Sequence, residues 1–390
     1  MNTVPATASV VIVGAGPAGM TAGIALADAG VDVVLLDKLA EGANASRAVV
    51  VHARTLEVLE SLGVTEQLHE HGLVVPKFVM YDGDRALARV SFAGLPTKYP
   101  YTVMIGQEST EAILLARLEK AGAQVYRHTE VTAVTQDADG VTVEYTDADG
   151  TPNSVRAQWV IGADGMHSKV REAARIGFTG ATYPESFVLA DVRMNWPDAR
   201  DEVSLHLSPE GVTVVAPLPD PRPDRYRIVA TVADAPEHQD LAYVQALVDA
   251  RRPGAHARVE EIVWSSRFRV HHRVADRYRA GRILLAGDAA HVHSPAGGQG
   301  MNTGIQDAAL LGRLLATVVD GAPADILDEY ETTRRPVALG VVKFTDRVTR
   351  MATLRPRPAR LVRNLLIGTA TRVPAVRRKL AYQLSELANR

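Results

Sequence analysis

A glycine-rich turn between two apolar strands constrains the fold of this chain more than any other feature. Residues 9–13 (SVVIV) form a continuous β-branched run, which is typical of a strand buried on both faces. The run ends in GAGPAG, a helix is predicted over Met20–Ala29, and VDVVLLD after Gly30 predicts a second strand. This strand–helix–strand order predicts a parallel sheet covered by helices, and therefore an α/β fold.

The glycines of this turn have the spacing of a dinucleotide-binding fingerprint. Gly14, Gly16 and Gly19 allow, in that order, a tight turn, a close approach of backbone to a pyrophosphate, and close packing of helix on strand. Asp37 closes the second strand, where a carboxylate can accept hydrogen bonds from a ribose. A glycine turn in another kind of α/β protein is the alternative. The complete unit favours a dinucleotide, without distinguishing NAD from FAD.

Length and composition limit the classes of protein that need to be considered. A chain of 390 residues exceeds one typical core, which predicts two domains. The formal net charge of -2 gives no overall reason to expect nucleic acid as a partner. The absence of Cys excludes disulfides and thiolate sites. Neither a signal peptide nor an apolar span of membrane length is found, so we expect a cytoplasmic protein with no integral membrane segment.

A second glycine-rich stretch, RILLAGDAAHVHSPAGGQGMN at 282–302, follows an apolar strand. The strand, Ile283–Ala286, delivers Asp288 at its carboxyl end, where a carboxylate can bind a polyol hydroxyl. The glycines of this stretch carry no side chains, so the backbone is accessible just before an amphipathic helix that begins near Met301. The free N–H groups and positive dipole end of that helix suit an anion or a polarised carbonyl, and a reduced flavin ring has this need.

The remaining segments predict a second, mainly extended region. Extended segments from about Val75 to Met104 include a hairpin with Asp82-Gly83 at its turn, and an amphipathic helix follows over Glu108–Gly122, capped by Ser109 or Thr110. A β-meander comes next. Short strands and proline-rich loops, with one helix at Leu241–Arg251, occupy Phe178–Arg269, and the chain is then mainly helical to its end.

Four segments, in this order, resemble the motifs of one family. They are GAGPAG at 14–19, RAVVVHARTLEVLESLG at 47–63, GADGMHSKVR at 162–171 and GDAAHVHSPAGGQGMN at 287–302. Together they resemble the FAD-dependent aromatic-ring hydroxylases related to para-hydroxybenzoate hydroxylase, and are most similar to its actinobacterial polyketide and antibiotic hydroxylases. The resemblance extends from about residue 8 to about residue 350.

The resemblance implies a two-domain fold and its boundaries. A Rossmann-like FAD-binding domain with a β-meander would accompany a discontinuous, mainly β substrate domain and C-terminal helices, without the thioredoxin-like domain of longer relatives. The expected ranges are 1–74, 106–175 and 271–350 for the FAD-binding domain, 75–105 and 176–270 for the substrate domain, and 351–390 for the C-terminal helical segment.

The resemblance also implies an activity. The protein would be an FAD-dependent monooxygenase that uses NAD(P)H and O2 to hydroxylate an aromatic or polyketide-like small molecule through a flavin C4a-hydroperoxide. No second dinucleotide motif is found, which fits NAD(P)H as a transient co-substrate, with NADPH slightly favoured. A dehydrogenase or quinone reductase without oxygen transfer, and a non-catalytic flavin-bearing sensor, are the alternatives. We expect a monomer or a homodimer.

Cofactor contacts are assigned by the resemblance, motif by motif. The residues implied at the FAD pyrophosphate are Gly14, Gly16, Ala18 and Gly19. Asp37, where the family more often has Glu, would bind the adenosine ribose, and Val131 would meet the adenine through its backbone. Arg47 would approach FAD from the loop after the second strand, and Gln107 would lie near the ribityl chain.

The later motifs imply contacts at the reactive end of the cofactor. Asp164 is associated with FAD and with transient nicotinamide cofactor binding, and Asp288 would hold a ribityl hydroxyl. Pro295 would line the substrate side of the flavin and is, with Arg47, a candidate for a catalytic role. The residues implied to present the helix start to the flavin ring are Gly300, Met301 and Asn302.

Several other residues have two interpretations. His291 and His293 could suggest a metal, but no further ligands have suitable spacing, so we expect loop hydrogen bonds and no metal. The basic run around His271 favours a solvated or phosphate-facing surface over nucleic acid. Polar candidates for activating a substrate are Tyr183, His206, Tyr226 and Arg227, none of which the sequence places. The Arg-rich C-terminal segment is expected to pack over the substrate domain or at a dimer interface, with a membrane surface as the alternative.

Overall fold

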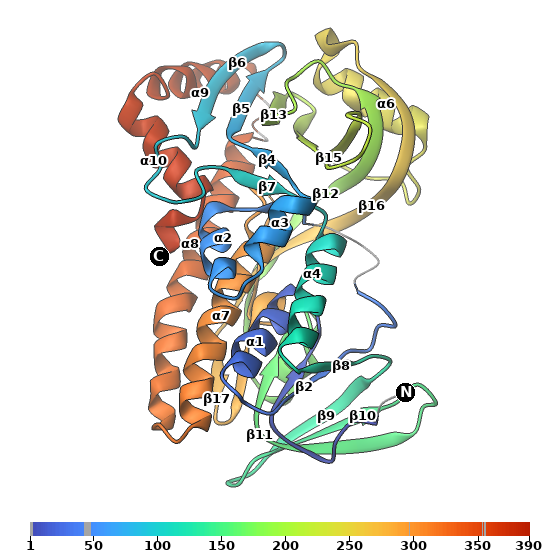
Figure 1. The fold of residues 1–390 in the computed structure, drawn as a ribbon. Helices are drawn as coiled ribbons and strands as arrows, with labels where there is room; N and C mark the ends of the chain where they lie inside the picture. Colours follow the sequence, from blue (N-terminus) through green and yellow to red (C-terminus); the bar gives the residue numbers. More distant parts are fainter. Residues whose placement is uncertain (1–2, 43–47, 296, 353, 355) are drawn as a thin grey trace.

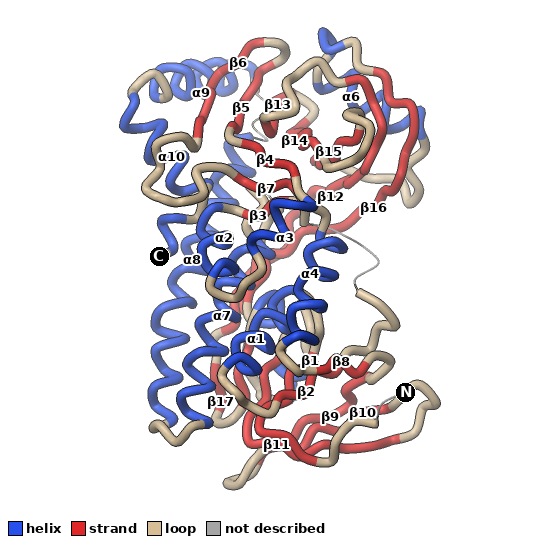
Figure 2. Tube along the Cα trace, in the orientation of Figure 1, coloured by secondary structure: helices blue, strands red, loops and turns tan. Residues whose placement is uncertain are grey.

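The fold has two sheet-based units linked by long strands, with helices along one side (Figures 1 and 2). The computed structural model describes residues 3–42, 48–295, 297–352, 354 and 356–390, and the side chains of 183–185, 270 and 352 are not described. The mixed α/β, two-unit architecture confirms the predicted fold class.

A mixed sheet with a parallel centre of β18, β11, β1, β2 and β8 forms the first unit. Its order is β17-β18-β11-β1-β2-β8, with β9 and β10 extending from β11 as the predicted meander. The strands are β1 (Thr7–Val13), β2 (Val33–Leu36), β8 (Gln124–Tyr126), β9 (Glu130–Gln136), β10 (Val141–Thr146), β11 (Pro152–Gly162), β17 (Arg279–Ala280) and β18 (Ile283–Leu285). Val10, Val11 and Ile12 of β1 are fully buried because helices cover the central strand.

The helices α1 (Pro17–Asp28) and α7 (Gly300–Val319) pack closely against each other. A Cβ on Gly312 would lie 2.7 Å from Ala25 Cβ, so glycine sets this close approach. α1 also contacts α4 (Gln107–Lys120). The N-cap of α4 is Gly106, so the prediction of Ser109 or Thr110 as its cap is wrong. The Thr110 hydroxyl instead donates to the Gly106 carbonyl inside the first turn, at 3.1 Å.

A second sheet forms the other unit, in the order β19-β16-β12-β15-β14-β13-β5-β6. The strands are β5 (Lys77–Asp82), β6 (Arg85–Ser91), β12 (Phe178–Asn195), β13 (Glu202–Ser208), β14 (Gly211–Pro217), β15 (Arg225–Val232), β16 (Arg258–Ala275) and β19 (His291–Val292). β5 pairs in parallel with β13, so the two mainly extended stretches of the sequence share this sheet.

Two long strands connect the units, and here the expectation of short strands is wrong. β12 and β16 each span 18 residues and pair antiparallel from Phe178–Ala275 to Asn195–Arg258. Register shifts interrupt the pairing at three places, which lets a continuous ribbon bend between the units. The predicted hairpin is present as β5 and β6, but it turns at Gly83-Asp84, one residue later than the expected Asp82-Gly83. The predicted helix α6 is confirmed at Leu241–Arg251, and the Asp240 side chain caps it.

The remaining elements surround the junction of the units. A small sheet of β3 (Val50–Val51), β7 (Thr102–Met104) and β4 (Leu73–Val75) lies there, with helices α2 (Ala53–Glu60), α3 (Thr65–His71) and α5 (Lys169–Ala173). The C-terminal helices are α8 (Asp328–Ala352), α9 (Arg357–Ala370) and α10 (Pro374–Leu384). α9 and α10 pack against β6, at the edge of the second sheet (Figure 1). Within the described part of the chain, no helix is long and apolar enough to cross a membrane.

Candidate active site

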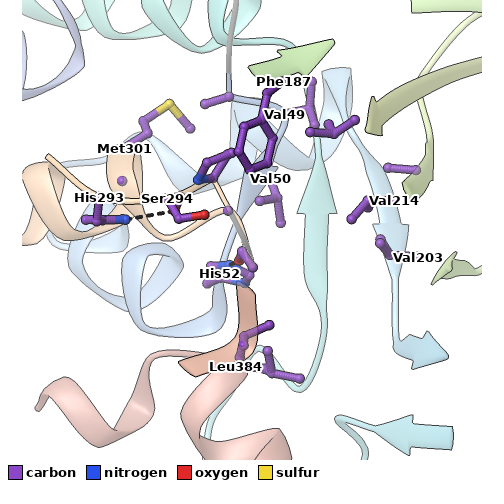
Figure 3. A pocket seen from close by; sticks show the side chains of 18 of the residues that line it. Val49, Val50, His52, Phe187, Val203, Val214, His293, Ser294, Met301 and Leu384 are labelled. Carbon is purple, nitrogen blue, oxygen red and sulfur yellow. Dashed lines mark hydrogen bonds between the residues drawn. The ribbon is translucent and has the colours of Figure 1, made fainter. Parts of the chain in front are cut away.

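One cavity of about 880 Å³ lies between the two units and is lined by both. Its lining includes the start of α1, the loop before α7, and the cavity-facing side chains of β12, β13, β14 and β15. Figure 3 shows Met301 and His293 on one side of this space and Val203 and Val214 on the other, with His52 between them. A cavity with a polar, glycine-rich end and an apolar end is the ordinary form of a cofactor and substrate site.

The three glycines of the first turn have different surroundings. Gly14 has φ +100°, and a Cβ there would lie 2.3 Å from the Ala163 carbonyl oxygen. A Cβ on Gly19 would lie 1.9 Å from the Gly14 carbonyl oxygen. A Cβ on Gly16 would meet nothing within 4 Å, and Gly16 lines the cavity. Packing therefore explains the first and third glycines. It does not explain the second, and the open space beside the Gly16 backbone fits a pyrophosphate.

Asp37 stabilises this turn from the end of β2. Its carboxylate accepts hydrogen bonds from the backbone N–H groups of Ala15 at 2.7 Å and Leu39 at 2.8 Å. A carboxylate has about four acceptor positions, so these two bonds leave capacity for a ribose hydroxyl. Arg47, the other residue predicted near this end, lies outside the described residues.

The start of α7 forms the opposite wall. Gly300 and Met301 line the cavity, and the first N–H groups of a helix have no partner within it. The Asn302 side chain is fully buried and has another role: it donates to the Val50 and Gly298 carbonyls and accepts from His52 N–H, each at 2.8 Å. Asn302 thus joins the second sequence motif to the last one, and only its backbone can face a ligand.

Some of the other predicted residues line the cavity, and others lie behind its wall. Those on the wall are Ala18, Gln107, Asp288 and Pro295. Asp164 does not line the cavity: its carboxylate accepts from the Lys169 and Val170 N–H groups at the start of α5, while its neighbours Ala163 and Gly165 line the wall. Val131 is buried in β9, away from the cavity lining.

Two buried histidines line the wall near α7. Burial lowers the pKa of His52 to about 4, although a hydrogen bond to the Gly297 carbonyl at 2.8 Å opposes this shift. Burial and the neighbouring His291 likewise lower the pKa of His293 to about 4. Both rings are therefore neutral near pH 7. Because Nε2 of His52 must donate to the carbonyl, its Nδ1 is an acceptor, and it has no partner among the described residues.

Sequence reasoning did not select His52. The signal was present in VVVHARTLE, where a polar ring follows a buried strand within a recognised motif. His291, in contrast, acts in the loop core as expected: its Nε2 lies 2.7 Å from Asp307, which also binds Arg334. Burial opposes ionisation of Asp307, but Arg334 and His291 hold its pKa below the usual range. No cluster of three potential metal-binding side chains occurs in the described ranges.

The second sheet contributes an apolar surface with one buried cation. Phe187 and Phe268 stack at 5.7 Å between ring centroids, and both line the cavity. Arg227, only 2% exposed, lines the cavity and binds the Asp191 carboxylate through two nitrogens at 2.5 and 2.8 Å. Its third nitrogen donates to the Ala48 carbonyl at 3.4 Å, which connects the second sheet to the segment after Arg47.

Among the polar candidates whose side chains the structure describes, Arg227 is the one that lines the cavity. Successive side chains of a strand point to opposite faces, so Tyr226 packs on the far side against α6. His206 also faces away from the cavity and stacks on Tyr81 at 5.1 Å. The side chain of Tyr183 lies outside the described residues.

A dinucleotide turn that opens into an apolar cavity between two sheets defines the class of protein: a two-domain dinucleotide-binding protein. The chain matches the FAD binding domain family over residues 7–345, and it belongs to this family.

Known relatives specify the kind of enzyme. The chain is 36% identical over 387 residues to YhjG of Bacillus subtilis, named as an uncharacterized aromatic compound monooxygenase, covering 97% of this chain and 75% of the relative. It is 38% identical to the 12-dehydrotetracycline 5-monooxygenase/anhydrotetracycline 6-monooxygenase of Streptomyces rimosus, covering 97% and 76%. Among solved structures, p-nitrophenol 4-monooxygenase of Pseudomonas putida superposes with a TM-score of 0.88 at 28% identity, covering 98% of this chain and 99% of that one. The protein is a flavin-dependent monooxygenase.

Proposed function

We propose that this enzyme hydroxylates an aromatic or polyketide-like small molecule with NAD(P)H and O2, in the cavity between its two sheets. The observation that carries the proposal is the continuity of one cavity from Gly16 to the apolar surface of Phe187 and Val214. A cofactor that spans from the glycine turn to α7 would place its ring beside a substrate on that surface. Relatives named for anhydrotetracycline and pentachlorophenol support this substrate class.

FAD supplies the oxygen-transfer chemistry once it has been reduced and has met dioxygen. The residues proposed to hold its pyrophosphate are Gly14, Gly16, Ala18 and Gly19, with Asp37 on the adenosine ribose and the Val131 backbone at the adenine. Arg47 and Gln107 would lie beside the cofactor, Asp288 would hold the ribityl chain, and Asp164 is assigned to the segment that meets FAD and the transient nicotinamide cofactor. The backbone N–H groups at the start of α7 would stabilise negative charge on the reduced ring, because the helix dipole is favourable there. Pro295 and Met301 would limit where the substrate can lie.

The apolar half of the cavity determines what can bind. Its walls carry Leu189, Val203, Val214 and Val229 alongside the stacked phenylalanines. Such a surface favours a flat apolar molecule and excludes water, which prevents loss of the activated oxygen as peroxide. Arg227 supplies positive charge at this surface, and we assign it the role of favouring a phenolate or carbonyl oxygen of the substrate.

The test is oxidation of NADH and, separately, NADPH by the purified holoenzyme with a panel of phenols, naphthoquinones, anthracyclinones and tetracyclines. We expect one substrate class to accelerate oxidation and to gain one oxygen atom, with little peroxide, and we expect NADPH to be the better reductant. Accelerated oxidation without oxygen gain would favour the dehydrogenase alternative. Flavin reduction that no panel member accelerates would favour the sensor.

A further inference from the structure

The outer face of α9 and the start of α10 is an apolar surface that nothing in the described chain covers. Leu361, Val362, Leu365 and Leu366 are 71, 57, 70 and 63% exposed, and Val373 is 49% exposed. With Val376, these residues make up six of the ten exposed large hydrophobic side chains in the described residues. Single exposed leucines are common on protein surfaces, but a cluster of this kind marks an interaction site.

The inner face of α9 packs against the second sheet. The exposed leucines therefore belong to a helix that is fixed in place on the protein. Ile367 packs against the apolar cluster of the second sheet that contains Met80 and Leu87. The Thr371 hydroxyl lies 3.3 Å from the Leu87 carbonyl, and Asn364 donates to Asp82. The inner face of α9 is therefore fixed, and its apolar outer face is free. A helix that lies at a membrane–water interface presents an apolar face in this way.

Basic residues surround the apolar face. The sequence 351–385 contains eight Arg and Lys residues and no Asp or Glu. The exposed ones in the described part are Arg357, Arg372, Arg377, Arg378 and Lys379. The structure gives these five no ion pair with any described acidic side chain. The partner must therefore offer both hydrocarbon and negative charge.

A lipid surface meets this requirement better than a second copy of the chain. In a two-fold dimer the same patch meets itself, so two sets of unpaired basic side chains would approach each other. An anionic bilayer offers acyl chains to the leucines and phosphate groups to the arginines. The net charge of the whole chain is only -2, so the attraction would come from this local cluster.

At Ala370 the exposed face of α9 meets the wall of the active-site cavity. Ile367 and Ala370 of α9 and its C-cap residue Thr371 line the cavity, and Ala370 is also exposed at the surface. Apolar molecules partition into bilayers, so an opening at the lipid surface would admit such a substrate with little passage through water. This last step depends on the proposed function, whereas the docking itself does not.

We propose that the outer face of α9 and the start of α10 docks the enzyme onto an anionic lipid surface. The test is co-sedimentation of the FAD-loaded protein with vesicles of phosphatidylcholine alone or mixed with phosphatidylglycerol, without substrate. We expect binding to the anionic vesicles that weakens as salt is added. The variant L361S/L365S should lower the partition coefficient by about tenfold or more, because both exposed leucines would lose their contact with hydrocarbon.

Matched variants separate the possible outcomes. R377E/R378E should weaken binding to anionic vesicles, whereas L241S, an exposed leucine on α6, should leave it unchanged. All of these side chains are exposed, so the variants should melt and bind FAD like the parent. The proposal is overturned if the parent does not sediment with anionic vesicles, or if L361S/L365S binds them equally well. It is also overturned if L361S/L365S instead converts a dimer to a monomer in light scattering, which would identify a second copy as the partner. Because no substrate is present, a failure here would leave the proposed oxidation untouched.

Discussion

The different surroundings of Gly14 and Gly16 give a sharp test of the cofactor site. Gly16 has φ -78° and ψ -175°, which alanine adopts freely, and a Cβ there meets nothing within 4 Å. Gly16→Ala should therefore preserve the apoprotein, or stabilise it by about 0.4–1 kcal/mol through the unfolded chain. Gly14 has φ +100°, and its Cβ would overlap the Ala163 carbonyl. Gly14→Ala should cost about 2–5 kcal/mol from backbone strain and overpacking together.

Gly16→Ala should weaken FAD binding even though it leaves the apoprotein stable. A methyl group on Gly16 would occupy the space next to the backbone that we assign to the pyrophosphate. Overpacking of about 1–3 kcal/mol would weaken FAD binding by about 5- to 150-fold. Thermal melts of the apoprotein and fluorescence titration with FAD measure the two effects separately. Gly340→Ala on α8, also with open space around its Cβ, is the matched control and should bind FAD normally. Normal FAD affinity in Gly16→Ala, or an apoprotein as unstable as Gly14→Ala, would refute the reasoning.

Three further predictions concern the cavity wall. Arg227→Met should destabilise the protein by about 3–5 kcal/mol in denaturant titration, because the buried Asp191 carboxylate loses both hydrogen bonds from Arg227 and retains only the more distant Arg225, at 3.7 Å, among the ion pairs of the described residues. Adding Asp191→Asn should recover much of this loss, and an additive double variant would contradict this expectation. The folded-state pKa of His52 is lowered from 6.5 to about 4, so its contribution to stability is complete above pH 6.5 and is lost as the pH falls to about 4. That loss is about 3 kcal/mol, and His52→Gln should show a correspondingly flatter pH profile of unfolding free energy. Val214→Trp should fill the apolar half of the cavity, so substrate binding should weaken at least about tenfold while FAD affinity stays unchanged in parallel titrations.

Features set by neighbouring residues in the sequence could be predicted. The turn glycines, the meander and the start of α7 depend on local spacing and on strand burial, and the structure has them where they were expected. Helix α6 agrees at both ends because Asp240 caps its start and Pro253 follows its last turn.

Features set by distant contacts could not be predicted. The length of β12 and β16 depends on their mutual pairing, which resumes after a register shift between Thr182 and Ser186. The faces of Tyr226 and Arg227 depend on which side of the sheet packs on α6, and a shift of one residue would exchange them. The roles of Asn302 and His52 arise from contacts about 250 residues apart in the chain. The exposure of Leu361 and Leu365 likewise depends on where α9 docks.

The central claim is that this cavity transfers one atom of dioxygen to an aromatic or polyketide-like substrate. The most direct measurement is mass spectrometry of the product formed by the FAD-loaded enzyme and NADPH under dioxygen labelled with the heavy oxygen isotope. The account predicts one labelled oxygen atom in the product, and none when the label is supplied in water. Label incorporated from water, or oxidation of the substrate without any added oxygen, would contradict the account.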